Sequence, residues 1–295
     1  MRPLEFGWFL PTSGDTTCYG DPAAQVSPSL EMFDRVVAAA EDAGFEYLLV
    51  PVSAACWDAY IASAVMVGRS RSIRMLVAAR PGYIAPVLLA KMIAALDQLS
   101  GGRVSVNLIA GQSDTETAAE GIRWTKEERY ALMDEEVSIL KALWTARGGV
   151  DFDGRFHTLK GARVAPLPFQ TPHPRFYLGG GSGQAWEISA KHADVHLFWG
   201  DTPERIAANM RDIRGIAARH GRGDAIGFGM RLQIVCRETE AEAWDAAHEL
   251  VRDTTEGQAR YIRTHYASSA ANRRIVPASM PHRSATRSGA LAGSR

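Results

Sequence analysis

A run of small residues, Gly179-Gly180-Gly181-Ser182, follows a short apolar stretch and opens a segment with helical character. Glycines let the backbone approach a phosphate closely, and the N-terminus of a helix favours an anion. The same four residues would also suit an ordinary turn between a strand and a helix. The run therefore predicts either a phosphate site or a plain turn.

Arg231 stands within the largely apolar segment Gly227–Val235, which has the composition of a strand. We expect an arginine inside a buried strand to be paired or to meet an anion, because an unpaired buried charge costs several kcal/mol. The planar guanidinium suits a sulfonate or a carboxylate. The alternative is an ion pair with an internal acidic residue.

The cysteines and histidines of the chain do not predict a metal site. The three cysteines (Cys18, Cys56 and Cys236) stand at wide spacings that suggest neither a disulfide framework nor a zinc motif. The eight histidines show no metal-like spacing, and only His196 falls in a predicted strand near the candidate site. No apolar run approaches the roughly 18–20 residues that span a bilayer, and no signal peptide is evident. We expect a cytoplasmic protein with reduced thiols, no metal and no membrane partner.

These residues need a scaffold, and strand–helix alternation supplies one. The seven candidate strands are Glu5–Leu10, Tyr47–Val50, Arg74–Ala78, Val104–Ile109, Phe176–Leu178, Val195–Phe198 and Gly227–Val235. Most are apolar throughout, as parallel strands covered on both faces are. Helical segments lie between them, with Ser27-Pro28, Pro86, Thr202-Pro203 and Thr239 as expected starts. The pattern predicts an α/β fold with a parallel sheet, either open or closed into a barrel.

Two regions depart from the repeat. Residues 148–175 carry four prolines and predict an insertion outside it. After Glu256 there is no acidic residue but there are seven arginines, and the sequence after Tyr266 offers no eighth strand–helix unit. We expect a barrel domain over residues 1–266, lacking an eighth unit, and a basic, disordered tail over 267–295. The tail has little aromatic interleaving, so we expect no nucleic-acid partner.

Short motifs at the ends of the predicted strands occur in the order found in a known family. They are Phe9-Leu10-Pro11-Thr12, Val50-Pro51 with Cys56, Leu76-Val77-Ala78-Ala79-Arg80-Pro81, Asn107-Leu108-Ile109-Ala110-Gly111, Glu128-Arg129-Tyr130, Gly179-Gly180-Gly181-Ser182, Trp199-Gly200 and Arg231-Leu232. Over roughly residues 4 to 270 the chain resembles the bacterial luciferase-like flavin-dependent monooxygenases, and most closely the alkanesulfonate monooxygenases.

The resemblance implies a (β/α)8 TIM barrel of luciferase-like type, here with seven units, and chemistry at the C-terminal ends of the strands. It implies reduced FMN (FMNH2), delivered by a separate NAD(P)H-dependent flavin reductase, together with O2 and a small anionic organosulfur substrate. The products would be an aldehyde and sulfite. An intact barrel would be expected to form a homo-oligomer.

The resemblance also assigns roles to residues. Catalytic or substrate-contacting positions would be Cys56, Trp199, Arg231 and Gln233. Cofactor-binding positions would be Phe9, Ala78, Gly111, Tyr130, Gly180, Gly181 and Ser182. Taken alone, Cys56 could equally be a small buried residue, and the two aromatic residues could be core packing.

Two departures from the family pattern leave the substrate open. Gln233 and Ser13 stand where close relatives carry histidines, and neither can move a proton near neutral pH. The alternatives are therefore a monooxygenase acting on a sulfone or another small organic substrate, a deazaflavin-dependent relative, and an inactive barrel.

Overall fold

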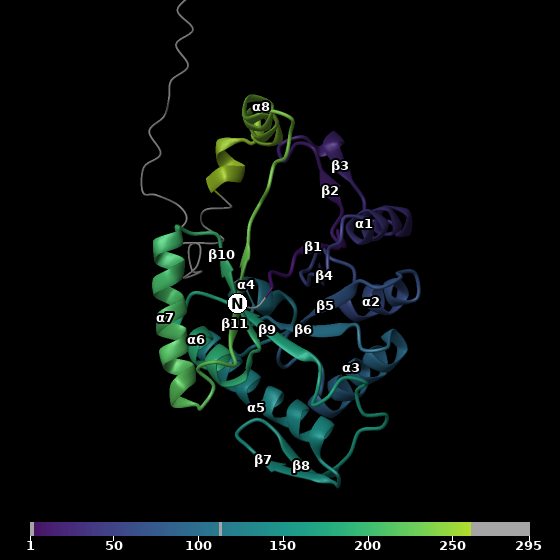
Figure 1. Ribbon diagram of the computed structural model, residues 1–295, viewed down its shortest axis with the longest axis vertical. Coiled ribbons are helices and arrows are strands. Elements are labelled where there is room, and N and C mark those ends of the chain that lie inside the picture. The colour runs from purple at the N-terminus through teal and green to yellow at the C-terminus, as the bar shows by residue number, and fades with distance from the viewer. Residues whose placement is uncertain (1–2, 112–113, 261–295) are drawn as a thin grey trace, which may run out of the picture.

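The computed structural model describes residues 3–111 and 114–260. Its main sheet is parallel and curved (Figure 1), and within these residues it has seven strands. In sheet order they are β1 (Gly7–Phe9), β4 (Tyr47–Val50), β5 (Arg74–Ala79), β6 (Val104–Leu108), β9 (Arg175–Gly179), β10 (Val195–Trp199) and β11 (Gly227–Arg231). Strand order follows chain order, as in a (β/α) barrel.

Helices follow the strands and cover the outer face of the sheet (Figure 1). They are α1 (Leu30–Asp42), α2 (Ala59–Val67), α3 (Pro86–Ser100), α5 (Lys126–Thr145), α6 (Gly183–His192) and α7 (Pro203–Arg219). The helix α8 (Glu240–Val251) follows β11 but lies away from the sheet and buries no residue. Most expected starts are confirmed: Pro86 opens α3, while Thr202 and Thr239 cap α7 and α8. The start of α1 was placed two residues early, because Ser29 caps it by accepting from the Met32 N–H.

Alternate side chains of each strand have different surroundings. Val50, Val77, Val106 and Phe176 belong to the main hydrophobic core between sheet and helices. Because successive strand residues point to opposite faces, the residues between them face the barrel interior. The interior-facing residues that matter below are Phe9, Ala78, Asn107, Tyr177, Trp199 and Arg231.

Smaller elements leave the repeat at three places. β2 (Asp15–Thr16) and β3 (Gln25–Val26) form a two-stranded sheet, with a 3-10 turn (Pro22–Ala24) between them. The short helix α4 (Asp114–Ala119) follows β6. Within the predicted insertion, β7 (Val150–Asp153) and β8 (Thr158–Ala162) pair antiparallel in a sheet of their own. The predicted tail, 267–295, lies outside the described residues.

The two edge strands approach each other at their C-terminal ends. The Arg231 guanidinium, from β11, lies 4.6 Å from the centroid of the Phe9 ring at the end of β1. Beyond the sheet, the Tyr19 N–H donates to the Leu250 carbonyl at 2.8 Å and so joins the segment after β1 to α8. The sheet is therefore curled far enough for side chains to bridge its edges.

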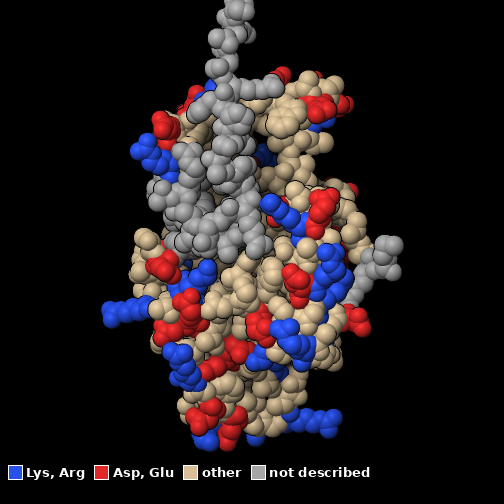
Figure 2. All heavy atoms as spheres, turned by 90° about the vertical axis from the view of Figure 1, so that its left-hand side faces the viewer, with Lys and Arg blue, Asp and Glu red and all other residues tan. Residues whose placement is uncertain are grey.

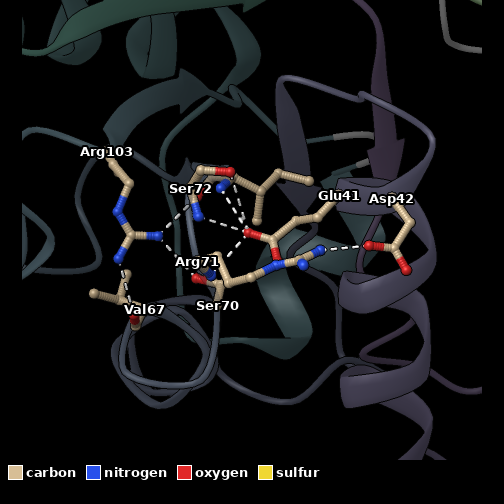
Figure 3. Close-up of polar contacts among 8 residues, drawn as sticks. Glu41, Asp42, Val67, Ser70, Arg71, Ser72 and Arg103 are labelled. Atoms are coloured by element: carbon tan, nitrogen blue, oxygen red, sulfur yellow. Dashed lines mark hydrogen bonds and ion pairs between the residues drawn. The ribbon is translucent and has the colours of Figure 1, made fainter.

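The loops at the N-terminal end are tied by polar side chains (Figure 3). The Glu41 carboxylate, at the end of α1, accepts the backbone N–H groups of Arg71, Ser72 and Ile73 at 2.8, 2.6 and 3.0 Å. Arg103 donates to the Ser70 hydroxyl at 2.9 Å and to the carbonyls of Ile73 and Val67. The turns that enter β5 and β6 are thus fixed from both sides.

All seven predicted strands are present, and the fold class is confirmed. Several strand ends differ from the prediction by one or two residues, and the largest error is at the last strand, which ends at Arg231, not Val235; residues 232–237 are exposed. On the face that Figure 2 shows, acidic and basic side chains are interspersed, without a broad area of one sign. No described helix combines the length and apolarity needed to span a bilayer. The described residues also hold no group of three side chains suited to a metal ion.

Candidate functional site

The predicted phosphate turn lies between β9 and α6. Gly180 has a φ of +141°, which favours glycine, and a Cβ there would lie 2.9 Å from the Ala185 Cβ. Ser182 is the N-cap of α6, and its hydroxyl accepts from the Ala185 N–H at 3.1 Å. The first N–H groups of the helix have no carbonyl partner within it, as at any helix start. The turn therefore offers backbone donors and a helix N-terminus at one point.

Tyr130, from the first turns of α5, reaches the same turn. Its hydroxyl would lie 3.5 Å from a Cβ at Gly180. Burial raises the pKa of Tyr130, and its hydrogen bond with the Ser182 side chain opposes this shift. The structure thus brings Tyr130, Gly180 and Ser182 together from two separate units of the barrel.

Gly111 lies in the loop after β6, and hydrogen bonds from Arg129 hold this loop. Its φ is +94°, and a Cβ would come 2.6 Å from the Thr117 side chain. The buried Arg129 donates to the Ala110 carbonyl at 2.6 Å and to the Asp114 carboxylate at 2.9 Å. This arginine fixes the path of the loop beside Tyr130.

Arg231 occupies a position different from the one predicted. It is the last residue of β11 and is exposed, so the argument from a buried strand charge was wrong. Its guanidinium lies over two half-buried rings, 4.5 Å from the centroid of Trp199 and 4.6 Å from that of Phe9. Stacking on aromatic faces holds a guanidinium in place by cation–π attraction.

A second arginine follows β5, and its charge is balanced. The Arg80 side chain is 3% exposed and forms ion pairs with Glu116 and Glu120 of the segment around α4. It also donates to the hydroxyl of Tyr83 at 3.3 Å. Because two carboxylates neutralise its guanidinium, Arg80 fixes the position of this segment and is poorly suited to bind another anion.

Asn107 is a further candidate for a ligand-binding residue, although the sequence alone marked it only as part of the motif at the end of the fourth strand. It pairs in register with Ala78 on β5 and Tyr177 on β9, and it faces the barrel interior. It is 4% exposed, and among the described residues its Oδ1 has no hydrogen-bond partner. A buried polar atom without a partner costs about 1–3 kcal/mol and points to a missing ligand. The signal in the sequence is the alternation of polar residues, Ser105 and Asn107, within Val104–Leu108.

Cys56 and Gln233 have no comparable setting. Cys56 is half-buried in the loop after β4, and its Sγ lies 3.2 Å from the Ser53 Oγ of the same loop. Gln233 is exposed beyond the end of β11. His196 faces away from the barrel interior, because its Nδ1 lies 2.9 Å from the Ser189 hydroxyl on α6. The ring nevertheless lies beside the Gly180 backbone, so His196 borders the glycine turn from the side of the helices.

Despite these differences, the candidate positions meet at one end of the sheet. Phe9, Trp199 and Arg231 end their strands, while Gly111 and the Gly180 turn follow theirs. The C-terminal end of a (β/α) barrel is where such enzymes carry their active sites. The arrangement offers donors for a phosphate on one side and a guanidinium between aromatic rings on the other.

Comparison with known proteins decides the family. A model of the luciferase-like monooxygenases matches residues 4–293. This chain belongs to the luciferase-like monooxygenase family. The luciferase-like fold and the flavin-dependent class that the motifs predicted are thereby confirmed.

Solved structures agree with the luciferase-like fold. Riboflavin lyase, in complex with modified FMN and riboflavin, has a TM-score of 0.80 at 19% identity, with 90% of this chain and 70% of that chain covered. EDTA monooxygenase from Chelativorans sp. BNC1 has a TM-score of 0.75 at 18% identity, covering 89% and 70%. A long-chain alkane monooxygenase has a TM-score of 0.76 at 17% identity, covering 91% and 74%. At these identities the likeness supports the fold and leaves the substrate open.

Proposed function

We propose that this chain binds reduced FMN and uses O2 to desulfonate a small alkanesulfonate, with release of an aldehyde and sulfite. The observation that carries this proposal is the Arg231 guanidinium between Phe9 and Trp199. A fixed, planar cation at the mouth of a barrel can donate two parallel hydrogen bonds to a sulfonate. The flanking rings suit a short alkyl chain.

FMN would be held at its phosphate by the turn after β9. Gly180 and Gly181 allow close approach of the backbone, Ser182 begins α6, and the Tyr130 hydroxyl lies beside them. The helix N-terminus adds a favourable dipole for the phosphate charge. The described residues at this turn include no acidic side chain in contact with it, so the phosphate would meet donors.

The flavin ring would lie within the strand ends. Ala78 is a small buried residue that pairs in register with Asn107. The Asn107 Oδ1 accepts no hydrogen bond from the described protein, so an N–H of the ring system would satisfy it. Gly111, held by Arg129, would border the ring at the next strand end. The buried polar atom and the small side chain both fit a planar ligand with N–H donors.

Reduced flavin supplies the electrons that reduce O2, with one oxygen atom going to the carbon that bears the sulfonate and the other to water. The carbon–sulfur bond breaks, and the products are the aldehyde, sulfite, oxidised FMN and water. The protein's part is to hold the anion at Arg231 and to exclude water with Phe9 and Trp199. A separate NAD(P)H-dependent reductase would return FMN to its reduced form.

A neutral organosulfur substrate such as a sulfone is the second candidate. It is favoured by Gln233 and Ser13, which are exposed and cannot act as proton carriers, and by His196, which faces the helices. A sulfone would use the aromatic rings and depend less on the charge of Arg231.

The test is a panel of alkanesulfonates and sulfones with purified chain, FMN, a flavin reductase and NADH, in which sulfite release reports turnover of sulfonates and aldehyde release reports turnover of both classes. We expect turnover of sulfonates, and Arg231→Ala should lower kcat/KM for them by about 100-fold or more, since a charge-assisted contact to the substrate is lost. Arg231→Lys keeps the charge, and we expect it to recover only part of the rate because the planar fork is absent.

The control is FMN affinity, which we expect both variants to retain within about twofold. Equal losses of FMN binding and of turnover would contradict the anion role. Turnover of sulfones that is indifferent to Arg231→Ala would support the second candidate. Absence of flavin binding by the unchanged chain would overturn both.

A further inference from the structure

A tryptophan of α6 forms a hydrogen bond with the glycine turn between β9 and α6. The indole Nε1 of Trp186, on α6, donates to the carbonyl of Gly180 at 3.2 Å. The Trp186 ring is half-buried and packs against both hydrophobic clusters. Its place is therefore fixed by packing, and the hydrogen bond transmits that fixed position to the turn.

Fixing the Gly180 carbonyl also fixes the orientation of the next backbone N–H group. A trans peptide unit is planar, so its C=O and N–H point in opposite directions. The Gly180 carbonyl points towards Trp186, and the N–H of the same peptide, which belongs to Gly181, must point away from it. The Ser182 side chain and the Tyr130 hydroxyl lie at the same turn.

A buried histidine also lies beside the Gly180 backbone. His196 is fully buried, and its Nδ1 lies 2.9 Å from the Ser189 Oγ. Burial lowers the pKa of His196 to about 4, and the neighbouring backbone of Gly180 opposes the shift only in part. The ring is therefore neutral at physiological pH and adds no charge of its own beside the turn.

We propose that Trp186 is a positioning residue for the cofactor phosphate, which aims the Gly181 N–H and thereby sets the preference for FMN over riboflavin. This inference rests on the proposed FMN site. It concerns only the phosphate end of the cofactor, because the Trp186 hydrogen bond ends on the turn that would hold the phosphate. Its measurable consequence is a ratio of two affinities, which a general loss of stability would leave unchanged.

Trp144 supplies a matched control. Its indole Nε1 donates to the Ala90 carbonyl at 3.1 Å, and it is 3% exposed between α5 and α3. Trp144→Phe and Trp186→Phe therefore remove the same kind of bond from a packed tryptophan. Only one of the two bonds ends on the glycine turn.

The experiment measures the Kd of oxidised FMN and of riboflavin by quenching of flavin fluorescence in the full chain and both variants. We expect Trp186→Phe to lower the FMN-to-riboflavin preference about 10-fold, by weakening FMN while riboflavin stays within twofold. Trp144→Phe should leave the preference as it is. Trp186→Met also lacks the donor but can fill the space, and it must show the same loss if the phenylalanine variant does not fold.

An unchanged preference in Trp186→Phe, or an equal loss in Trp144→Phe, would overturn the inference. So would equal affinity of the unchanged chain for FMN and riboflavin, because the phosphate would then contribute nothing. Failure of the proposed desulfonation gives a different result, since sulfite release is lost while the affinity ratio can still be measured.

Discussion

The two ends of the barrel treat their polar groups differently. At the N-terminal end, the Glu5 carboxylate accepts from Arg74 at 2.7 Å and from Arg175 at 3.1 Å, where β5 and β9 begin. The Glu41 carboxylate gathers three backbone N–H groups in the turn before β5 (Figure 3). At the C-terminal end, the Asn107 Oδ1 and the Thr12 Oγ1 are buried, and the described residues offer them no partner.

The difference separates folding from function within one scaffold. Polar groups that are fully satisfied by the protein stabilise it, and partial satisfaction costs free energy that only a ligand can recover. We infer that the N-terminal end carries stability and that the C-terminal end is built around a molecule it must bind.

Gly180→Ala should have the largest effect. The added Cβ would lie 2.9 Å from the Ala185 Cβ in a backbone conformation that alanine rarely adopts, so the turn must shift. We expect FMN affinity to fall by about 100-fold, or ~2.7 kcal/mol. Titration with FMN and thermal unfolding of the same sample would measure binding and stability together.

The control for this change lies at the other end. Gly101 has a φ of +64° at the C-cap of α3, and a Cβ there meets no atom within 4 Å. Gly101→Ala should cost about 1 kcal/mol of stability and leave FMN binding unchanged. If Gly101→Ala weakened FMN binding as much as Gly180→Ala, the division between the two ends would fail.

Glu41→Gln should affect stability alone. Burial would raise the pKa of Glu41, but the backbone N–H groups of Ser72 and Ile73, with Arg71, lower it to about 2. A lowered pKa means that the carboxylate stabilises the fold above its unfolded pKa of 4.5 and that this contribution is lost as the pH falls through about 2. We expect the variant to be about 2 kcal/mol less stable at pH 7, with the difference shrinking steadily below pH 4.5.

Urea unfolding at pH 7, 4.5 and 3 would follow this difference. Asp42→Asn is the matched control, because Asp42 pairs with the same Arg71 but its side chain is 70% exposed. We expect it to change stability by less than about 0.5 kcal/mol. A pH-independent effect of Glu41→Gln, or weaker FMN binding at pH 7, would contradict the assignment of this end to stability.

Much of the fold could be predicted because strand composition and helix caps are local. All seven strands follow apolar runs, and Thr239 with Glu242 forms the capping box that its spacing predicts. Errors occurred where the sequence was ambiguous. The segment after Arg231 is apolar enough for a strand, but β11 ends there and Leu232 is 54% exposed.

The site was harder to predict because facing direction depends on strand register. His196 and Asn107 are both polar residues within apolar strands, and the sequence gives no reason to prefer one. In the fold, His196 meets Ser189 on the outer side, whereas Asn107 faces inwards beside Ala78. The stacking of Arg231 between Phe9 and Trp199 likewise joins three strands and has no local signal.

Asn107→Leu should have a smaller effect than Gly180→Ala or Glu41→Gln, and it should change stability and FMN binding in opposite directions. Leucine has a similar shape and no polar atom, so it removes the buried acceptor for which the described residues offer no partner. We expect the variant to be about 1 kcal/mol more stable, a rise in Tm of roughly 2–4 °C, and to bind FMN about 10-fold more weakly. Ser105→Ala, two residues nearer the N-terminal end of β6, should leave FMN binding unchanged. A variant that gained no stability, or that lost stability and binding together, would mean that Asn107 serves the fold and not the ligand.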